Sequence, residues 1–279
     1  MNVPTGLIPK VDRAISVLRA HRGVVVALSG GVDSATLLAV ACEALGARNV
    51  LAVTGRSSSV AEPEIEDARR VAEHLRVAHS VVDTHEMDRA AYRQNAGDRC
   101  FHCRTELFEV LSAVSSRRGA GAIAYGAIVD DLGDDRPGMQ AAREMGILAP
   151  LLDANICKIE VRVLAKTFNL HIHDKPSNAC LASRMPIGFE VTPERLSQVD
   201  RAEKGLRELG FRQCRVRHHG EIARIELIGE DADRLGNPGL RSAISRAVKS
   251  AGFKYVAVDL EGYNQGPLHL IEPARHSGQ

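Results

Sequence analysis

The sequence predicts an α/β fold, with a parallel β-sheet covered by helices on both faces and a small α+β unit at the C-terminal end. Short apolar segments alternate with helical segments through the first part of the chain, which is the pattern of a parallel sheet. These short strands are apolar throughout, as expected for strands buried on both faces. After about residue 188 the order changes to helix, strand, strand, helix, strand.

The predicted strands of the parallel sheet are residues 24–28, 50–53, 79–82 and 122–125. The predicted helices of this part are an amphipathic N-terminal segment, residues 35–46, 63–75 and 105–119, and a helix starting near Lys158. Residues 129–138 are acidic and turn-forming, and residues 175–184 (KPSNACLASR) lack a clear periodicity. We interpret both as loops, where functional residues are frequent.

The C-terminal unit begins with a helix that has Thr192 as N-cap, Pro193 in its first turn and Gly210 beyond its end. The remaining predicted elements are strands at 214–218 and 223–228, a helix at 238–252 and a strand at 255–260. His218 and His219 are interpreted as turn residues. We therefore predict two domains, residues 1–187 and residues 188–279.

Composition narrows the class of protein. The chain has 279 residues and a formal net charge of +1, which does not favour an electrostatic nucleic-acid binder. No apolar run reaches the roughly 20 residues of a membrane helix, and the N-terminus lacks the apolar region of a signal peptide. A cytoplasmic location is expected. The six cysteines then indicate metal binding or catalysis better than structural disulfides.

The segment SGGVDS, residues 29–34, lies directly between a predicted strand and a predicted helix. Gly30 and Gly31 allow a tight turn with exposed backbone amides, and a helix N-terminus attracts anions. Ser29 and Ser34 can donate hydrogen bonds to phosphate oxygens, whereas Asp33 suits a Mg²⁺ contact or a brace for the loop. The alternative is a glycine-rich turn with a serine N-cap.

This segment matches the SGGxDS signature of the PP-loop ATP pyrophosphatases, which implies a Rossmann-like (HUP-type) sheet and an adenylating reaction that releases pyrophosphate. Further motifs are RCFHCR (99–104), RPG (136–138), KIEVR (158–162), KPSNACLASR (175–184), RVRHHGEIARIEL (215–227) and KYVAVDLEGY (254–263). Together they resemble the LarE family, the ATP-dependent sulfur transferases of lactate-racemase nickel-pincer cofactor biosynthesis. The resemblance runs from about residue 24 to residue 260.

The resemblance implies conversion of the carboxylates of pyridinium-3,5-biscarboxylic acid mononucleotide into thiocarboxylates, with Cys180 as the catalytic cysteine. Some family members sacrifice this sulfur, whereas others hold an iron–sulfur cluster that supplies sulfide. Cys100 and Cys103 with Cys180 favour the [4Fe–4S] type. A zinc site, a redox pair and ordinary thiols at a helix start remain alternatives. Cys42 and Cys157 are expected in the core.

Lys158 is assigned to the pyrophosphate of ATP, and Arg184 to a phosphate, with a surface arginine as the alternative. Arg215 and Arg217 alternate along one strand, so they share a face that suits a mononucleotide phosphate. By resemblance they line the substrate site with Glu203 and Glu226. Cross-strand salt bridges are the alternative interpretation.

The expected ligands are therefore ATP with Mg²⁺ and the pyridinium mononucleotide, with neither a nucleic acid nor a membrane as partner. The resemblance also implies a homo-oligomer. Two other functions stay open at this point. One is a PP-loop thiolase acting on tRNA or another small molecule, and the other is a non-catalytic ATP-binding redox sensor.

Overall fold

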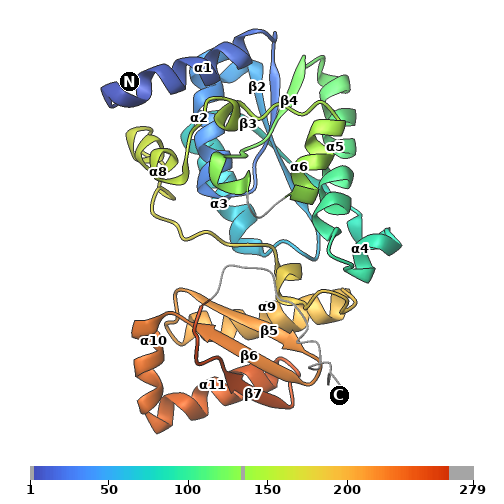
Figure 1. The fold of residues 1–279 in the computed structure, drawn as a ribbon, viewed down its shortest axis with the longest axis vertical. Coiled ribbons are helices and arrows are strands. Elements are labelled where there is room, and N and C mark those ends of the chain that lie inside the picture. Colours follow the sequence, from blue (N-terminus) through green and yellow to red (C-terminus); the bar gives the residue numbers. More distant parts are fainter. Residues whose placement is uncertain (1–2, 133–135, 264–279) are drawn as a thin grey trace, which may run out of the picture. The chain divides into compact units, whose positions relative to one another are not determined.

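The structure is a computed structural model that describes residues 3–132 and 136–263. The chain divides into two compact units (Figure 1). Unit 1 contains residues up to Arg89 and residues Asp98–Asn178, and unit 2 contains Ala90–Gly97 and the chain from Ala179 onward. Within the described residues, no helix is both long and apolar enough to cross a membrane.

Unit 1 is built on a four-stranded sheet in which every neighbouring pair is parallel. Its strands, in the order β3-β2-β1-β4, are β1 (Val24–Ala27), β2 (Val50–Arg56), β3 (Ala78–Asp83) and β4 (Ala122–Ala124). The helices are α1 (Ile8–Arg19), α2 (Val32–Leu45), α3 (Glu62–His74), α5 (Arg99–Arg118), α6 (Arg136–Glu144), α7 (Pro150–Asp153) and α8 (Lys158–Thr167). The predicted parallel sheet is thus confirmed.

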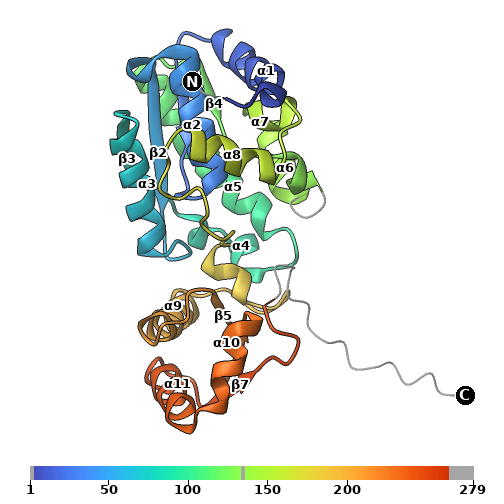
Figure 2. The same cartoon turned by 90° about the vertical axis from the view of Figure 1, so that its left-hand side faces the viewer.

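Side chains of successive residues of β1 pack into two different hydrophobic clusters, one on each face of the sheet. Val24 and Val26 pack with residues of α1, α2, α3 and α8, whereas Val25 packs with residues of α5 and α6. This is the two-fold alternation of a strand, and both faces are apolar because helices cover both (Figures 1 and 2). The predicted double covering of the sheet is confirmed.

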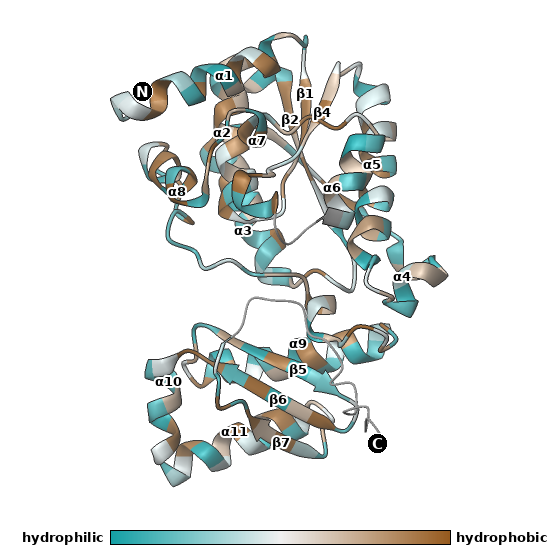
Figure 3. Cartoon of the chain, in the orientation of Figure 1, coloured by the Kyte–Doolittle hydropathy of each residue, from teal (hydrophilic) through white to brown (hydrophobic). Residues whose placement is uncertain are grey.

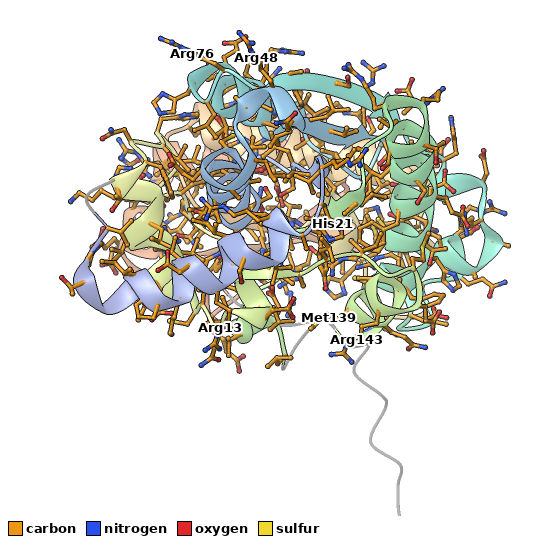
Figure 4. All side chains as sticks on the ribbon, turned by 90° about the horizontal axis from the view of Figure 1, so that it is seen from above. Arg13, His21, Arg48, Arg76, Met139 and Arg143 are labelled. Carbon is orange, nitrogen blue, oxygen red and sulfur yellow. The ribbon has the colours of Figure 1, made fainter. Side chains whose placement is uncertain are left out.

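Helix α2 is buried along most of its length and contacts both α1 and α8. A helix that is apolar on nearly all sides belongs in a core, and Figure 3 shows hydrophobic colours on α2 and β1 beside hydrophilic colours along α5. Exposed arginines lie on separate segments of unit 1: Arg13, Arg48, Arg76 and Arg143 (Figure 4). Strand β1 and helix α2 therefore form a rigid frame for the loop that joins them.

Unit 2 contains a three-stranded sheet of order β5-β6-β7. Its elements are α4 (Ala90–Gln94), α9 (Pro193–Glu208), β5 (Cys214–His219), β6 (Ile222–Leu227), α10 (Gly229–Asp233), α11 (Pro238–Ser250) and β7 (Tyr255–Val258). Strands β5 and β6 are antiparallel, and β6 and β7 are parallel. Thr192 is the N-cap of α9, as predicted, and its hydroxyl accepts a hydrogen bond from the amide of Arg195 at 3.3 Å.

Short helical turns complete the chain: η1 (Thr5–Leu7), η2 (Ala47–Asn49), η3 (Glu86–Asp88), η4 (Val129–Leu132), η5 (Leu181–Arg184) and η6 (Arg234–Gly236). The predicted loop at 129–138 contains η4 and the first residues of α6, while its residues 133–135 lie outside the described residues. Helix α6 was missed because Pro137 and Gly138 resemble turn signals. A proline is nevertheless well tolerated in the first turn of a helix.

Three local predictions are corrected by the structure. Helix α5 begins at Arg99, so Cys100 and Cys103 lie within its first five residues and do not precede it. His218 and His219 are the last residues of β5 and not turn residues. Cys157 is half-buried and not a core residue. It is the N-cap of α8, and its amide donates to the Glu160 carboxylate at 2.9 Å in a capping box.

The division between the units differs from the predicted boundary after residue 187. Unit 2 begins at Ala179 and also includes residues 90–97. The side chain of Asn95 donates to the carbonyl oxygens of Pro186 at 2.6 Å and Phe189 at 3.1 Å. These contacts tie a segment far upstream in the sequence to the start of unit 2, which a composition change near residue 188 could not reveal.

Candidate functional site

The SGGVDS loop of unit 1 joins β1 to α2, with Gly31 as the N-cap of the helix. The Ser34 hydroxyl donates to the Gly31 carbonyl at 3.1 Å and accepts from the Ser29 amide at 3.1 Å. The hydroxyl oxygens of Ser29 and Ser34 are 3.0 Å apart. The first turn of α2 has backbone amides without helical partners and a partial positive charge, so the loop is suited to bind an anion.

Two glycines let the backbone approach this loop closely. Gly30 has a φ of 76°, and a Cβ atom there would lie 2.1 Å from the carbonyl oxygen of Glu64 in α3. Gly126, just beyond β4, is also in close contact with the backbone, because a Cβ atom there would lie 2.7 Å from the amide nitrogen of Ser34. Sequence reasoning missed Gly126, since no local motif marks a contact between residues so far apart along the chain.

Asp33 and Lys158 form an ion pair next to the loop. The Lys158 Nζ donates to the two carboxylate oxygens of Asp33 at 2.9 and 2.7 Å. Burial raises the pKa of Asp33 above its ordinary value, although the Lys158 cation opposes this shift. The structure thus brings together two residues that the sequence assigned separately to Mg²⁺ and to pyrophosphate.

The acidic pair after β4 positions the start of α8. The carboxylate of Asp130 accepts a hydrogen bond from the Lys158 amide at 2.8 Å, and that of Asp131 accepts from the Ile128 amide at 2.9 Å. Asp130 therefore satisfies one of the amides that a helix N-terminus leaves without a helical partner. This contact holds the backbone of Lys158 while its side chain reaches Asp33.

Lys175, at the start of KPSNACLASR, is a further residue that sequence reasoning did not single out. Its Nζ donates to the Gly30 carbonyl at 3.0 Å and to the carboxylates of Glu64 at 2.8 Å and Asp67 at 2.7 Å. Arg162 in turn donates to the carbonyl oxygens of residues 173 and 175, both at 2.9 Å. The segment that leads to Cys180 is thereby fastened to the SGGVDS loop.

The three cysteines assigned to sulfur chemistry belong to different units. Cys100 and Cys103 lie near the start of α5 in unit 1, and Cys180 belongs to unit 2. Cys100 and Cys180 are exposed, and Cys103 is half-buried. In the part of the chain that the structure describes, no three His, Cys, Asp or Glu side chains form a group that could hold a metal ion.

Cys180 immediately precedes η5, and Arg184 ends that turn. The Arg184 side chain is 1% exposed and pairs with Glu203 of α9, which is 2% exposed, at 2.8 Å. Burial by itself would lower the pKa of Arg184, but Glu203 more than offsets it, and the pKa lies above its ordinary value. Arg184 is therefore a buried cation and not the surface arginine that the sequence allowed.

Arg215 and Arg217 project from one face of β5, together with Glu226 of the adjacent strand β6. Arg217 donates to Glu226 at 2.8 Å, so the cross-strand ion pair that the sequence left open is present. The Arg215 guanidinium lies 4.5 Å from the ring centroid of Tyr263, and burial lowers its pKa below the ordinary value. The five residues assigned to the substrate all lie in unit 2, and all are buried: Arg184, Glu203, Arg215, Arg217 and Glu226.

Comparison with known proteins agrees with these features. The family model described as NAD synthase matches residues 11–110. An NH(3)-dependent NAD(+) synthetase of Methanococcoides burtonii is 46% identical over 61 residues, which are 22% of this chain and 23% of that protein. An uncharacterised protein of Synechocystis is 40% identical, with 88% of this chain and 91% of the relative covered.

A pyridinium-3,5-bisthiocarboxylic acid mononucleotide synthase of Lactiplantibacillus plantarum is 34% identical to this chain. The match spans 266 residues and covers 94% of the chain and 95% of the relative. It therefore includes both units, with the SGGVDS loop, the cysteines and the buried arginines. The chain belongs to the family of this synthase, the LarE family of PP-loop proteins.

Proposed function

We propose that this protein is an ATP-dependent sulfur transferase that converts pyridinium-3,5-biscarboxylic acid mononucleotide into its bisthiocarboxylic acid. The observation that carries the proposal is the presence, in one chain, of an anion-binding loop at the start of α2 and an exposed Cys180 just after a segment fastened to that loop. The relative of L. plantarum supports the choice of substrate.

The first half of the reaction activates a carboxylate. A carboxylate oxygen of the substrate attacks the α-phosphorus of ATP, an acyl-adenylate forms and pyrophosphate leaves. Ser29, Ser34 and the amides of Gly30 and Gly31 bind phosphate oxygens. Lys158 turns from Asp33 to the pyrophosphate. Asp33 would then be the residue that holds Mg²⁺, and the ion would neutralise charge on the phosphates.

The second half transfers sulfur. In the sacrificial route, the Cys180 thiolate attacks the carbonyl carbon of the adenylate, a thioester forms, and AMP leaves with the former carboxylate oxygen. A base then removes the Cα proton of Cys180 and the Cβ–S bond breaks. The product keeps the sulfur as a thiocarboxylate, and residue 180 becomes dehydroalanine. Each carboxylate of the substrate requires one such sulfur.

Unit 2 supplies the proposed substrate contacts. Arg215 and Arg217 project from one face of β5 and are buried there beside Glu226. Two buried guanidinium groups on one face suit an anion such as the phosphate of a mononucleotide, which arginine binds in bidentate fashion. Because Arg215 and Arg217 are 2% and 1% exposed, the side chains around them must move to admit it.

For the sulfur source, we propose a [4Fe–4S] cluster held by Cys100, Cys103 and Cys180. Cys100 and Cys103 are three residues apart on a helix and so lie on one side of it, and their soft thiolates are the donors that such clusters use. When bound, the cluster would supply sulfide from an iron that no protein thiolate ligates. Reduced thiols of this kind suit a cytoplasmic enzyme. The family resemblance also supports a homo-oligomer.

The test of the overall function is pyrophosphate release with Mg-ATP. Release should depend on the pyridinium substrate, and thiocarboxylate should form with it. Release with no requirement for this substrate would favour a thiolase with another acceptor. ATP binding without any release would favour the redox sensor and refute the proposal.

The sulfur source is tested by iron and acid-labile sulfide analysis after anaerobic purification. Wild type should contain both, Cys103→Ala and Cys180→Ala should lose them, and Cys42→Ala, at the far end of α2, should keep them. A colourless and active wild type that converts Cys180 to dehydroalanine during turnover would overturn the cluster and establish sacrifice of the cysteine sulfur.

A further inference from the structure

The Arg184 guanidinium is bound to the backbone of Cys180. Its Nη1 donates to the carbonyl oxygens of Ala179 at 2.7 Å and Cys180 at 3.2 Å, and also to the Ser183 hydroxyl at 3.0 Å. The side chain thus folds back under the short turn that begins with the cysteine. The carbonyl oxygens on both sides of the Cys180 Cα atom point toward one buried cation, while the cysteine itself remains exposed.

Glu203 fixes this cation in turn. Its two carboxylate oxygens accept from Nε and Nη2 of Arg184 at 2.8 and 3.1 Å, a bidentate geometry. The same carboxylate accepts from the backbone amide of Val216 in β5 at 3.1 Å. A continuous chain of hydrogen bonds therefore runs from the sheet of unit 2, through Glu203 and Arg184, to the backbone of Cys180.

A second contact holds the other end of the turn. Arg217 donates to the Ser183 carbonyl at 3.0 Å, and the Ser183 amide donates to the Cys180 carbonyl at 2.9 Å. Leu181 and Ala182 of the turn are buried as well. Directional bonds from buried charges therefore act together with apolar packing to hold the conformation of this turn.

We propose that Arg184 and Glu203 are positioning residues that hold the sulfur of Cys180 in its reactive place, and that they do not bind the substrate phosphate. This inference rests on the proposed sulfur transfer. It assigns the phosphate contact to Arg215 and Arg217 alone. A misplacement of about 1 Å in a reacting group can reduce a rate roughly 100-fold, so the pair acts on the sulfur step and not on adenylation.

The test compares Arg184→Lys and Glu203→Gln with Asp200→Asn. Asp200 is three residues before Glu203 on the same helix, and Arg207 lies 3.7 Å from both carboxylates. Asp200→Asn therefore removes a neighbouring charge and leaves the bonds between Arg184 and Glu203 in place, which makes it a matched control. Pyrophosphate release and thiocarboxylate formation are measured in a single turnover over a range of substrate concentrations. In both positioning variants, adenylation and the KM of the substrate should stay within about threefold of wild type, while thiocarboxylate formation falls roughly 100-fold.

A second readout needs no substrate. Hydrogen exchange of the peptide 179–185 reports the Ser183 amide, which is bonded to the Cys180 carbonyl, and its exchange should accelerate about tenfold in both variants, as after loss of a hydrogen bond. Asp200→Asn should leave it unchanged. This readout stands even if wild type fails to release pyrophosphate with the pyridinium substrate, in which case the proposed function alone fails.

Three results would overturn the assignment. One is a raised substrate KM with adenylation and sulfur transfer reduced together, which identifies Arg184 as a substrate contact. Another is unchanged thiocarboxylate formation in both variants, and the third is unchanged exchange of the 179–185 peptide. If Glu203→Gln fails to fold, Glu203→Asp retains the charge and tests the same geometry.

Discussion

Replacement of Gly126 by alanine tests which contacts hold the SGGVDS loop in position. The added Cβ atom would lie 2.7 Å from the amide nitrogen, 2.8 Å from the Cα atom of Ser34 and 2.9 Å from the carbonyl carbon of Asp33. All three atoms belong to the backbone of the first turn of α2, so rotation of a side chain cannot relieve the overlap. The turn must move by several tenths of an ångström.

Overpacking of this kind costs about 1–3 kcal/mol of unfolding free energy. The displaced turn also carries the amides and the Ser34 hydroxyl that we propose as phosphate ligands, so pyrophosphate release should fall roughly 10- to 100-fold. Urea unfolding measures the first effect. Isothermal titration with ATP and the pyrophosphate assay measure the second, and the titration is independent of the acceptor substrate.

Gly121→Ala is the matched control, because Gly121 stands immediately before β4 as Gly126 stands beyond its end. A Cβ atom at Gly121 would meet the His21 Cβ atom at 3.5 Å and the Arg22 amide nitrogen at 3.6 Å, which are ordinary contacts. The two variants should therefore differ clearly. Equal stability and equal ATP affinity in both would refute the argument that close backbone contact at Gly126 sets the position of the loop.

Three other changes probe the charged groups. Lys158→Met leaves the buried Asp33 carboxylate without its cation, so the pKa of Asp33 should rise further and the acidic limb of the pH profile of pyrophosphate release should move to higher pH. Lys175→Met should raise the KM of ATP about tenfold and lower the unfolding free energy by about 1–2 kcal/mol, as measured by kinetics and urea unfolding. Burial lowers the pKa of His218 from 6.5 to about 4, so the folded state loses up to roughly 3 kcal/mol of stability as the pH falls from 6.5 to 4. The stability of His218→Gln, followed by urea unfolding at several pH values, should depend less on pH than that of wild type.

The parts of the fold that the sequence predicts are those governed by local pattern. Strands β1, β2 and β4 are largely buried and appear as apolar runs, so they could be placed within a few residues. Strand β3 is half-exposed, and its position follows from the alternation of strands and helices. Thr192 marks the start of α9 because its hydroxyl can accept a hydrogen bond from a free helix amide. Gly46 marks the end of α2 because glycine readily adopts the backbone conformation found beyond a helix. The SGGVDS loop is recognisable for the same reason, since its function depends on consecutive residues.

Contacts between distant residues could not be predicted in this way. Lys175 binds the Gly30 carbonyl across 145 positions of sequence, and nothing in the residues beside either one specifies the other. Hydrophobic periodicity identifies which face of a helix is buried but not which charged group lies opposite a lysine. The predicted start of α5 is wrong for a related reason. Cys100 and Cys103 indicate a ligand motif before the helix, although two such cysteines fit equally well inside it.

Buried or half-buried charges hold the segment around Cys180 at both ends, in addition to the apolar packing of Leu181 and Ala182. Before the cysteine, Lys175 donates a hydrogen bond to the Gly30 carbonyl of the SGGVDS loop in unit 1. After it, Arg184 joins the chain to Glu203 in unit 2, and the passage from one unit to the other falls between residues 178 and 179. Charge pairs impose direction and register where small side chains cannot. Loss of the Lys175 anchor should therefore weaken ATP binding, whereas loss of the Arg184 anchor should spare ATP and impair sulfur transfer, and this separation follows from the different units that the two anchors hold.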